Sequence, residues 1–181
     1  NWFAREMHSA STSGTFDEKR ARIADLLAPE SITMELKNHT KDGILSEMTD
    51  MLVHAGRVAS GPTLLTALRD REKLCSTGVG RGISFLHPRH VITDIAKEPV
   101  LAFGRSAKGV DFDAVDGEKV HFFFLDCAPS ERMHLAMLAR LARLLADDNL
   151  LEKLRAAATP EDAIRVIRQA ENALAPGESV N

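Results

Sequence analysis

The chain has 181 residues, of which 44% are hydrophobic, which is enough apolar material for one domain of ordinary size. A net charge of −3, with eight Phe, one Trp and no Tyr, argues against nucleic-acid binding through a basic surface or stacked bases. No apolar run approaches the roughly 20 residues of a membrane-spanning helix, so membrane insertion is not expected. The two cysteines, Cys75 and Cys127, lie far apart in the sequence, which argues against a disulfide framework and for a reducing cytoplasm.

The chain divides into three predicted regions. Residues 1–22 are rich in small polar side chains without periodicity, which predicts a disordered tail or the remnant of an upstream segment. Residues 23–174 are predicted to form a single domain, because periodic apolar segments follow one another without a long linker. Residues 175–181 are expected to fray.

Two helices are predicted in the first half of the domain, after a short helix or turn at residues 21–27 and a half-buried strand at 31–36. Apolar residues recur at helical spacing over residues 41–55, with Thr40 as the N-cap. Ser60, Gly61 and Pro62 open the second helix, because proline is well tolerated in a first helical turn. This second helix brings Arg71 to the start of a glycine-rich segment.

The glycine-rich segment, residues 76–90, places Gly78, Gly80 and Gly82 at alternate positions before a short apolar strand that ends at His87. Glycines allow a close approach of the backbone, and their N–H groups can surround an anion. Further strands are predicted at 91–93, 99–103 and 120–125, with a loop at 104–108 and a turn at Asp116-Gly117. The strand at 120–125 is almost wholly apolar, which is typical of a central strand covered on both faces.

The last part of the domain is predicted to be helical. Ser130 is a suitable N-cap for a helix with His134 in its first turn, and residues 147–149 interrupt the helical pattern. A short helix is expected around residues 150–154. Thr159 and Pro160, followed by acidic residues, begin a final helix.

His87 is the candidate reactive residue, because it lies at a strand end, where ligands tend to bind in α/β sheets. With an ordinary pKa of about 6.5, its imidazole is largely neutral at cytoplasmic pH and can attack phosphorus. The donors expected to hold the phosphoryl group are Arg71, the hydroxyls of Ser76 and Thr77, and the amides of Gly78, Gly80 and Gly82. A purely structural role for His87 remains the alternative.

Two other kinds of site compete with this one. His87 and His90, with Cys75 and Cys127, have residue types that bind metals, but Pro88 prevents helical spacing between the histidines. The glycine segment lacks the lysine and hydroxyl order of a P-loop and leads into a strand, unlike the dinucleotide fingerprint. No metal or nucleotide cofactor is therefore expected.

The segments Arg71-Glu72-Lys73 and Ser76-Thr77-Gly78-Val79-Gly80-x-Gly82-Ile83-x-Phe85-x-His87 resemble the phosphorylation segment of phosphotransferase-system enzyme IIA domains of the fructose/mannitol class (EIIA type 2). The nitrogen-regulatory branch, enzyme IIA-Ntr, is the most similar. The resemblance extends from about Leu26 to Glu171. It includes residues 111–117, His134-Leu135 and residues 154–157.

The resemblance implies an α/β fold, a single domain with a mixed, mostly five-stranded sheet flanked by helices on both faces. It implies that His87 carries a phosphoryl group on Nε2, that Arg71 stabilises this group, and that His134 donates to it. The implied donor is a phosphorylated HPr-like or NPr-like carrier. The implied recipients are an EIIB domain or regulated proteins such as kinases or transporters. No cofactor is implied.

One feature departs from the family pattern. The family usually has proline before the phosphorylated histidine, whereas here Leu86 precedes His87 and Pro88 follows it. Pro88 lacks an N–H group and biases His87 towards extended backbone. We expect the site to be reshaped but still able to accept phosphate, with a phosphorylation-incompetent binding module as the alternative. Whether His121 is a core residue or lines the site is left open.

Overall fold

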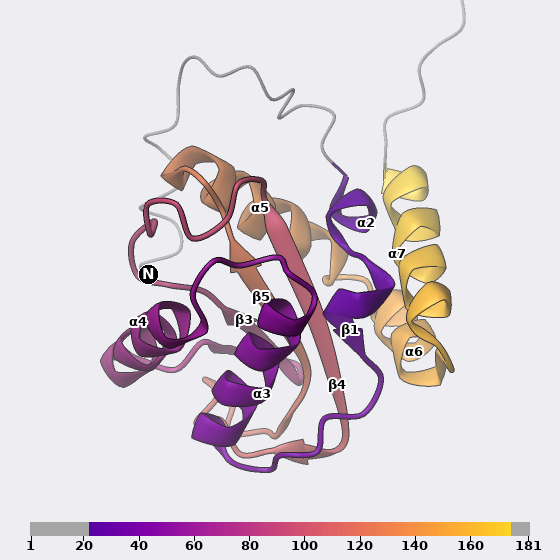
Figure 1. Ribbon diagram of the computed structural model, residues 1–181. Coiled ribbons are helices and arrows are strands. Elements are labelled where there is room, and N and C mark those ends of the chain that lie inside the picture. Colours follow the sequence, from indigo (N-terminus) through magenta and orange to yellow (C-terminus); the bar gives the residue numbers. More distant parts are fainter. Residues whose placement is uncertain (1–21, 175–181) are drawn as a thin grey trace, which may run out of the picture.

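The computed structural model describes residues 22–174 as one sheet between two layers of helices (Figure 1). The sheet is mixed and has five strands, in agreement with the α/β fold that the sequence predicts. The predicted tail, apart from Arg22, and the predicted frayed end lie outside the described residues. Within this part of the chain, no helix combines the length and apolar character needed to cross a membrane.

The five strands are arranged in the order β1-β4-β5-β3-β2. Their bounds are β1 Ile32–Thr33, β2 Gly78–Gly80, β3 Ile83–Leu86, β4 Val100–Val110 and β5 Val120–Cys127. The central strand β5 runs antiparallel to β4 and parallel to β3, in a register that pairs Leu86 with Leu125. Because parallel strands end at the same edge of a sheet, the residues after β3 lie beside the end of β5.

The helices cover both faces of the sheet (Figure 1). Their bounds are α2 Ile23–Leu26, α3 Lys41–His54, α4 Gly61–Leu74, α5 Glu131–Leu144, α6 Asp148–Ala156 and α7 Pro160–Leu174, with a 3₁₀ turn, η1, at Pro29–Ser31. The predicted N-caps Thr40 and Ser130 are confirmed, and Ser60 caps the second helix; each of the three accepts a hydrogen bond from the backbone N–H three residues later. These caps fix where the helices begin, and with them the positions of Arg71 and His134.

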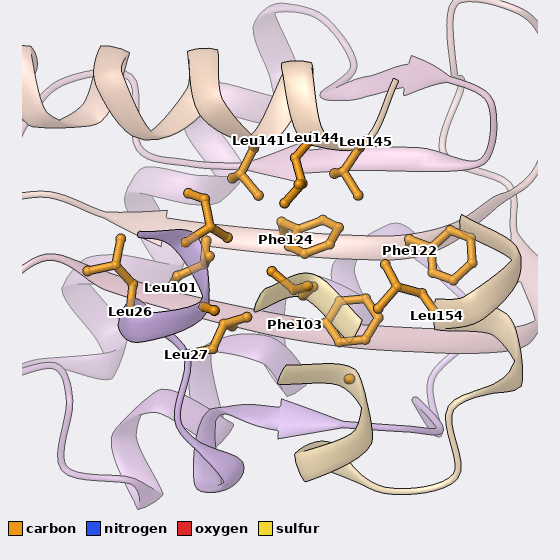
Figure 2. Close-up of a cluster of buried hydrophobic side chains, with 14 of the residues drawn as sticks. Leu26, Leu27, Leu101, Phe103, Phe122, Phe124, Leu141, Leu144, Leu145 and Leu154 are labelled. Atoms are coloured by element: carbon orange, nitrogen blue, oxygen red, sulfur yellow. The ribbon is translucent and has the colours of Figure 1, made fainter. Parts of the chain in front are cut away.

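The alternating side chains of β4 and β5 form two separate cores. On one face, Phe103, Phe122 and Phe124 pack with residues of α2, α5, α6 and α7. Figure 2 shows Leu141 and Leu144 of α5, and Leu145 at its end, projecting towards Phe124. On the other face, Phe123 and Leu125 pack with residues of α3 and α4. The central strand is therefore buried on both sides, as its apolar sequence predicts.

Three predicted segments differ from the structure. Residues 91–93 form no strand, because both edges of β5 are already occupied and the chain instead crosses to β4 through a loop in which Ile95 is buried. The half-buried strand predicted at 31–36 is only the two residues of β1. Residues 104–108 belong to β4, where the register aligns Arg105 with Phe122. The Arg105 guanidinium also donates to the backbone oxygens of Leu154, in the last turn of α6, and Ala157, just after that helix.

Gly104 allows α3 to pack closely against β4. A Cβ atom at this position would lie 2.6 Å from Met48 Sδ and 2.9 Å from Leu36 Cδ1. The glycine that suggested a loop in the sequence is thus needed for a close contact within the core.

A Gly104→Val substitution is expected to lower the free energy of unfolding by about 1–3 kcal/mol, because the added side chain overpacks this contact. Lys108→Ala, at an exposed position of the same strand, should change it by no more than about 0.5 kcal/mol. Urea denaturation of the two variants and the parent measures both values, and equal midpoints for all three would contradict the proposed packing.

Candidate functional site: a buried histidine pair

His87 lies directly after β3 and is only 4% exposed. Its Nδ1 is 2.8 Å from the backbone oxygen of Phe85. A carbonyl oxygen can only accept, so Nδ1 carries the proton and Nε2 carries the lone pair of the neutral ring. Nε2 is therefore the nucleophilic atom of His87.

Arg71 points its guanidinium at this atom from the last turn of α4. Its Nε donates to His87 Nε2 over 3.1 Å. Its Nη1 donates to the backbone oxygen of Cys75 over 2.9 Å, and the whole residue is 6% exposed. The end of α4 thus holds a buried positive charge beside the nucleophilic nitrogen.

The surroundings of His87 keep its ring neutral. Burial, above all, lowers the pKa of His87 to about 4, and the neighbouring His134 and Arg71 act in the same direction. Asp126 and the hydrogen bond to Phe85 oppose this shift without overcoming it. At neutral pH, His87 is therefore an uncharged imidazole with an available lone pair.

His134 comes from the first turn of α5 and faces His87. The two ring centroids are 4.9 Å apart, and the rings are tilted by 40°. His134 Nδ1 lies 2.7 Å from Oδ2 and 3.1 Å from Oδ1 of Asp126. The structure thus brings together Arg71, His87 and His134, the three residues that the sequence predicts at the centre of the site.

Asp126 is a residue of this site that the sequence reasoning missed. It is 2% exposed and lies near the end of β5, directly after Leu125, which pairs with Leu86 of β3. A signal was present, because a single carboxylate interrupts a strand of otherwise apolar residues close to its carboxyl end. Burying such a charge is costly unless it is paired, which points to a partner nearby.

A pocket of about 370 Å³ opens beside the histidine pair. Its lining includes His87, Pro88, His90, Asp126, Glu131 and His134. Pro88 follows the end of the β3 ladder and forms part of the pocket wall beside His87. His121 is not part of this lining; its Nδ1 donates to the backbone oxygen of Ser106 over 2.9 Å.

The glycine segment forms a β-hairpin rather than a loop around His87. Gly80 and Gly82 lie before β3 and His87 lies after it, so a four-residue strand of about 13 Å separates them. The predicted phosphate contacts of Gly80 and Gly82 are therefore not supported by their positions. Gly82 instead accepts backbone hydrogen bonds from residues 121 and 122.

Ser76, Thr77 and Gly78 lie closer to the site, but their polar groups have other partners. Ser76 Oγ donates to the backbone oxygen of Phe112 and accepts from the N–H of Gly78. The hydroxyl and N–H of Thr77 both donate to the Glu72 carboxylate. These contacts fix the hairpin beside the end of α4 and so position Arg71.

The alternative metal site is not assembled. Across residues 22–174, no group of three or more His, Cys, Asp or Glu side chains is placed to hold a metal ion. Burial raises the pKa of the Cys127 thiol, which disfavours the thiolate that metals bind, and Cys75 lies beside Arg71.

Residues 25–170 match the protein family described as "Phosphoenolpyruvate-dependent sugar phosphotransferase system, EIIA 2". Two relatives carry names from different branches. A fructose-specific EIIA component of Haloferax volcanii is 37% identical over 73% of this chain and 85% of its own length. A nitrogen regulatory protein of Bradyrhizobium diazoefficiens is 36% identical over 74% of this chain and 86% of its own length.

The chain is also similar to part of a longer relative and to a solved structure. The chain spans 23% of the fructose-specific EIIABC component of Bacillus subtilis, to which it is 31% identical over 150 residues. The crystal structure of nitrogen regulatory protein IIA-Ntr from Neisseria meningitidis superposes with a TM-score of 0.72 at 28% identity, covering 80% of this chain and 98% of that one. Because the family match covers most of the chain and the fold agrees, the chain belongs to the EIIA type 2 family of the phosphoenolpyruvate-dependent sugar phosphotransferase system.

Proposed function

We propose that this protein accepts a phosphoryl group on Nε2 of His87 from a phosphorylated HPr-like or NPr-like carrier in the cytoplasm. The observation that carries the proposal is the hydrogen bond from His87 Nδ1 to Phe85, since it leaves the lone pair on Nε2. The neutral, buried ring beside an open pocket and a buried arginine gives further support. Membership of a phosphocarrier family agrees with this chemistry.

The transfer step requires no base at His87. The bond between phosphorus and the carrier's histidine nitrogen breaks while the bond between phosphorus and Nε2 forms, and the carrier nitrogen keeps the electron pair. His87 retains its Nδ1 proton, and Phe85 continues to accept it, so the ring becomes positively charged as it binds the phosphoryl group. The carbonyl stabilises this charge.

Arg71 changes partner during this step. In the unphosphorylated protein its Nε donates to the lone pair that must attack phosphorus. As phosphorus approaches Nε2, the guanidinium turns to the phosphoryl oxygens, where a buried arginine stabilises the developing negative charge. His134, 4.9 Å away between ring centroids, donates to the same oxygens from the other side.

We propose a mainly regulatory role in nitrogen, carbon or potassium metabolism, in which partners such as kinases or transporters distinguish the two phosphorylation states. A phosphoryl group adds about 1.5–2 negative charges at one place, which is a sufficient signal for a binding partner. The similarity to fructose-specific components favours one alternative, transfer of the group to an EIIB domain in sugar transport.

Incubation with phosphoenolpyruvate, enzyme I and an HPr-type carrier is expected to add one acid-labile phosphoryl group, detected by intact-protein mass spectrometry. His87→Ala should abolish this addition because it removes the nucleophile. His90→Ala is the matched control, since His90 lines the same pocket, and should be modified normally. Unmodified parent protein, or modified His87→Ala, would contradict the proposed function.

Arg71→Ala is expected to slow phosphoryl transfer by about 10²–10³-fold, because a buried donor to the transferring group is lost. Arg69→Ala is the control, since Arg69 lies on the same helix but pairs with Asp42 at the surface. Rapid-quench measurement of the phosphorylated fraction gives both rates. A normal rate for Arg71→Ala would exclude Arg71 from the transition state.

The neutral state of His87 has a pH signature. Its pKa of about 4 predicts that the ring remains uncharged, with the proton on Nδ1, between about pH 8 and pH 5. Nitrogen-15 NMR of the histidine side chains should show no titration of His87 in this range. A midpoint near the ordinary value of about 6.5 would disprove the burial effect.

A further inference from the structure

We propose that Asp126 is a positioning residue for phosphoryl transfer, which holds His134 in the Nδ1–H form and keeps its ring protonated so that Nε2–H is directed at the phosphoryl group on His87. The inference rests on the proposed function, since it assigns a role within the same site. It concerns a residue that acts through His134 and does not itself contact the phosphoryl group.

The contact between Asp126 and His134 is close and sheltered. Both carboxylate oxygens lie near His134 Nδ1, at 2.7 and 3.1 Å, and the side chains of Asp126 and His134 are 2% and 17% exposed. Asp126 is fixed by the central strand, and His134 by the first turn of a helix that Ser130 caps. The two groups are thus held together by rigid elements rather than by a loop.

The hydrogen-bonding rules assign the His134 nitrogens. An ionised carboxylate only accepts, so Nδ1 must donate, as in histidines that a carboxylate orients. When the ring is protonated, Nε2 is also a donor. The two histidines then have opposite roles: His87 is neutral and offers a lone pair, whereas His134 is charged and offers an N–H group.

The charges around the pocket determine whether His134 keeps its proton. His87 from β3 is neutral, and Arg71 from α4 directs its guanidinium at His87 Nε2. Arg89 and His90 from the loop and Glu131 from α5 also line the pocket. Among these groups Asp126 is the buried carboxylate in direct contact with the ring, and an ionised carboxylate at this distance favours the protonated form of the imidazole.

The pairing also protects the phosphoryl group. A buried carboxylate close to the site would repel an incoming phosphate unless a positive partner offsets its charge. A protonated His134 offsets it while remaining able to donate from Nε2. Removing His134 alone should thus slow phosphoryl transfer more than removing both His134 and the Asp126 charge. A purely structural role for Asp126 does not predict this difference.

The first test uses the unphosphorylated protein and nitrogen-15 NMR. In Asp126→Asn, His134 is expected to lose its proton at least about tenfold more readily, a shift of about one pH unit, and to lose its fixed Nδ1–H form. Glu131→Gln, which removes a carboxylate of the same pocket without that contact, should leave the titration close to the parent's. An unchanged titration of His134 in Asp126→Asn would overturn the proposal.

The second test measures phosphoryl transfer from the HPr-type carrier. Asp126→Asn is expected to be about 10–100-fold slower than the parent, and Asp126→Glu should recover part of this loss. In a His134→Ala background, Asp126→Asn should cause no further loss and should partly restore transfer. Equal losses in both backgrounds would reduce Asp126 to a structural role.

The two tests separate the possible failures. If the parent protein takes no phosphate, the proposed function fails, while the NMR titration still decides whether Asp126 controls His134. If Asp126→Asn does not fold, Asp126→Glu and the single His134→Ala variant still provide the comparison, and a full-rate His134→Ala protein would overturn the proposal.

Discussion

The parallel pairing of β3 with β5 is the constraint on which the site depends. Its register, from Ile83–Phe122 to Leu86–Leu125, brings the ends of two strands to one edge of the sheet. His87 follows one strand and Asp126 lies near the end of the other, and α5 places His134 beside both of them. A slip of one residue would turn every side chain of β3 to the opposite face and separate the groups.

Burial gives this geometry its chemical character. Exposed to water, His87 would be partly protonated near neutral pH, and Arg71 beside it would be of little consequence. In the structure, both are almost fully covered, so His87 stays neutral while the arginine keeps its charge. The apolar faces of β3 and β5 thus do more than stabilise the fold, because they set the protonation state that the proposed transfer requires.

Local sequence signals predicted much of this arrangement. Cap residues such as Ser60 and Ser130 fixed the helix starts, and the apolar run of β5 identified the central strand, because these signals lie within one element. The resemblance of the segments around Arg71, His87 and His134 to the EIIA family identified the three central groups of the site.

The remaining features depend on contacts between distant segments. Asp126 matters through a helix residue that only the folded chain brings near, and strand β4 needs a glycine at position 104 because Met48 of α3 packs against it. Likewise, the positions of Gly80 and Gly82 are decided by the hairpin register, which the alternation of glycines does not specify. The roles of these residues depend on strand pairing and helix packing between distant segments, which the local sequence pattern does not predict.

The central claim is that His87 offers Nε2, and only Nε2, to phosphorus. The most direct measurement is NMR of the phosphorylated, nitrogen-15-labelled protein, in which a one-bond coupling to phosphorus-31 identifies the modified nitrogen. The account predicts this coupling at Nε2 of His87, with Nδ1 still protonated and bonded to Phe85. A coupling at Nδ1, or at any other histidine, would contradict it.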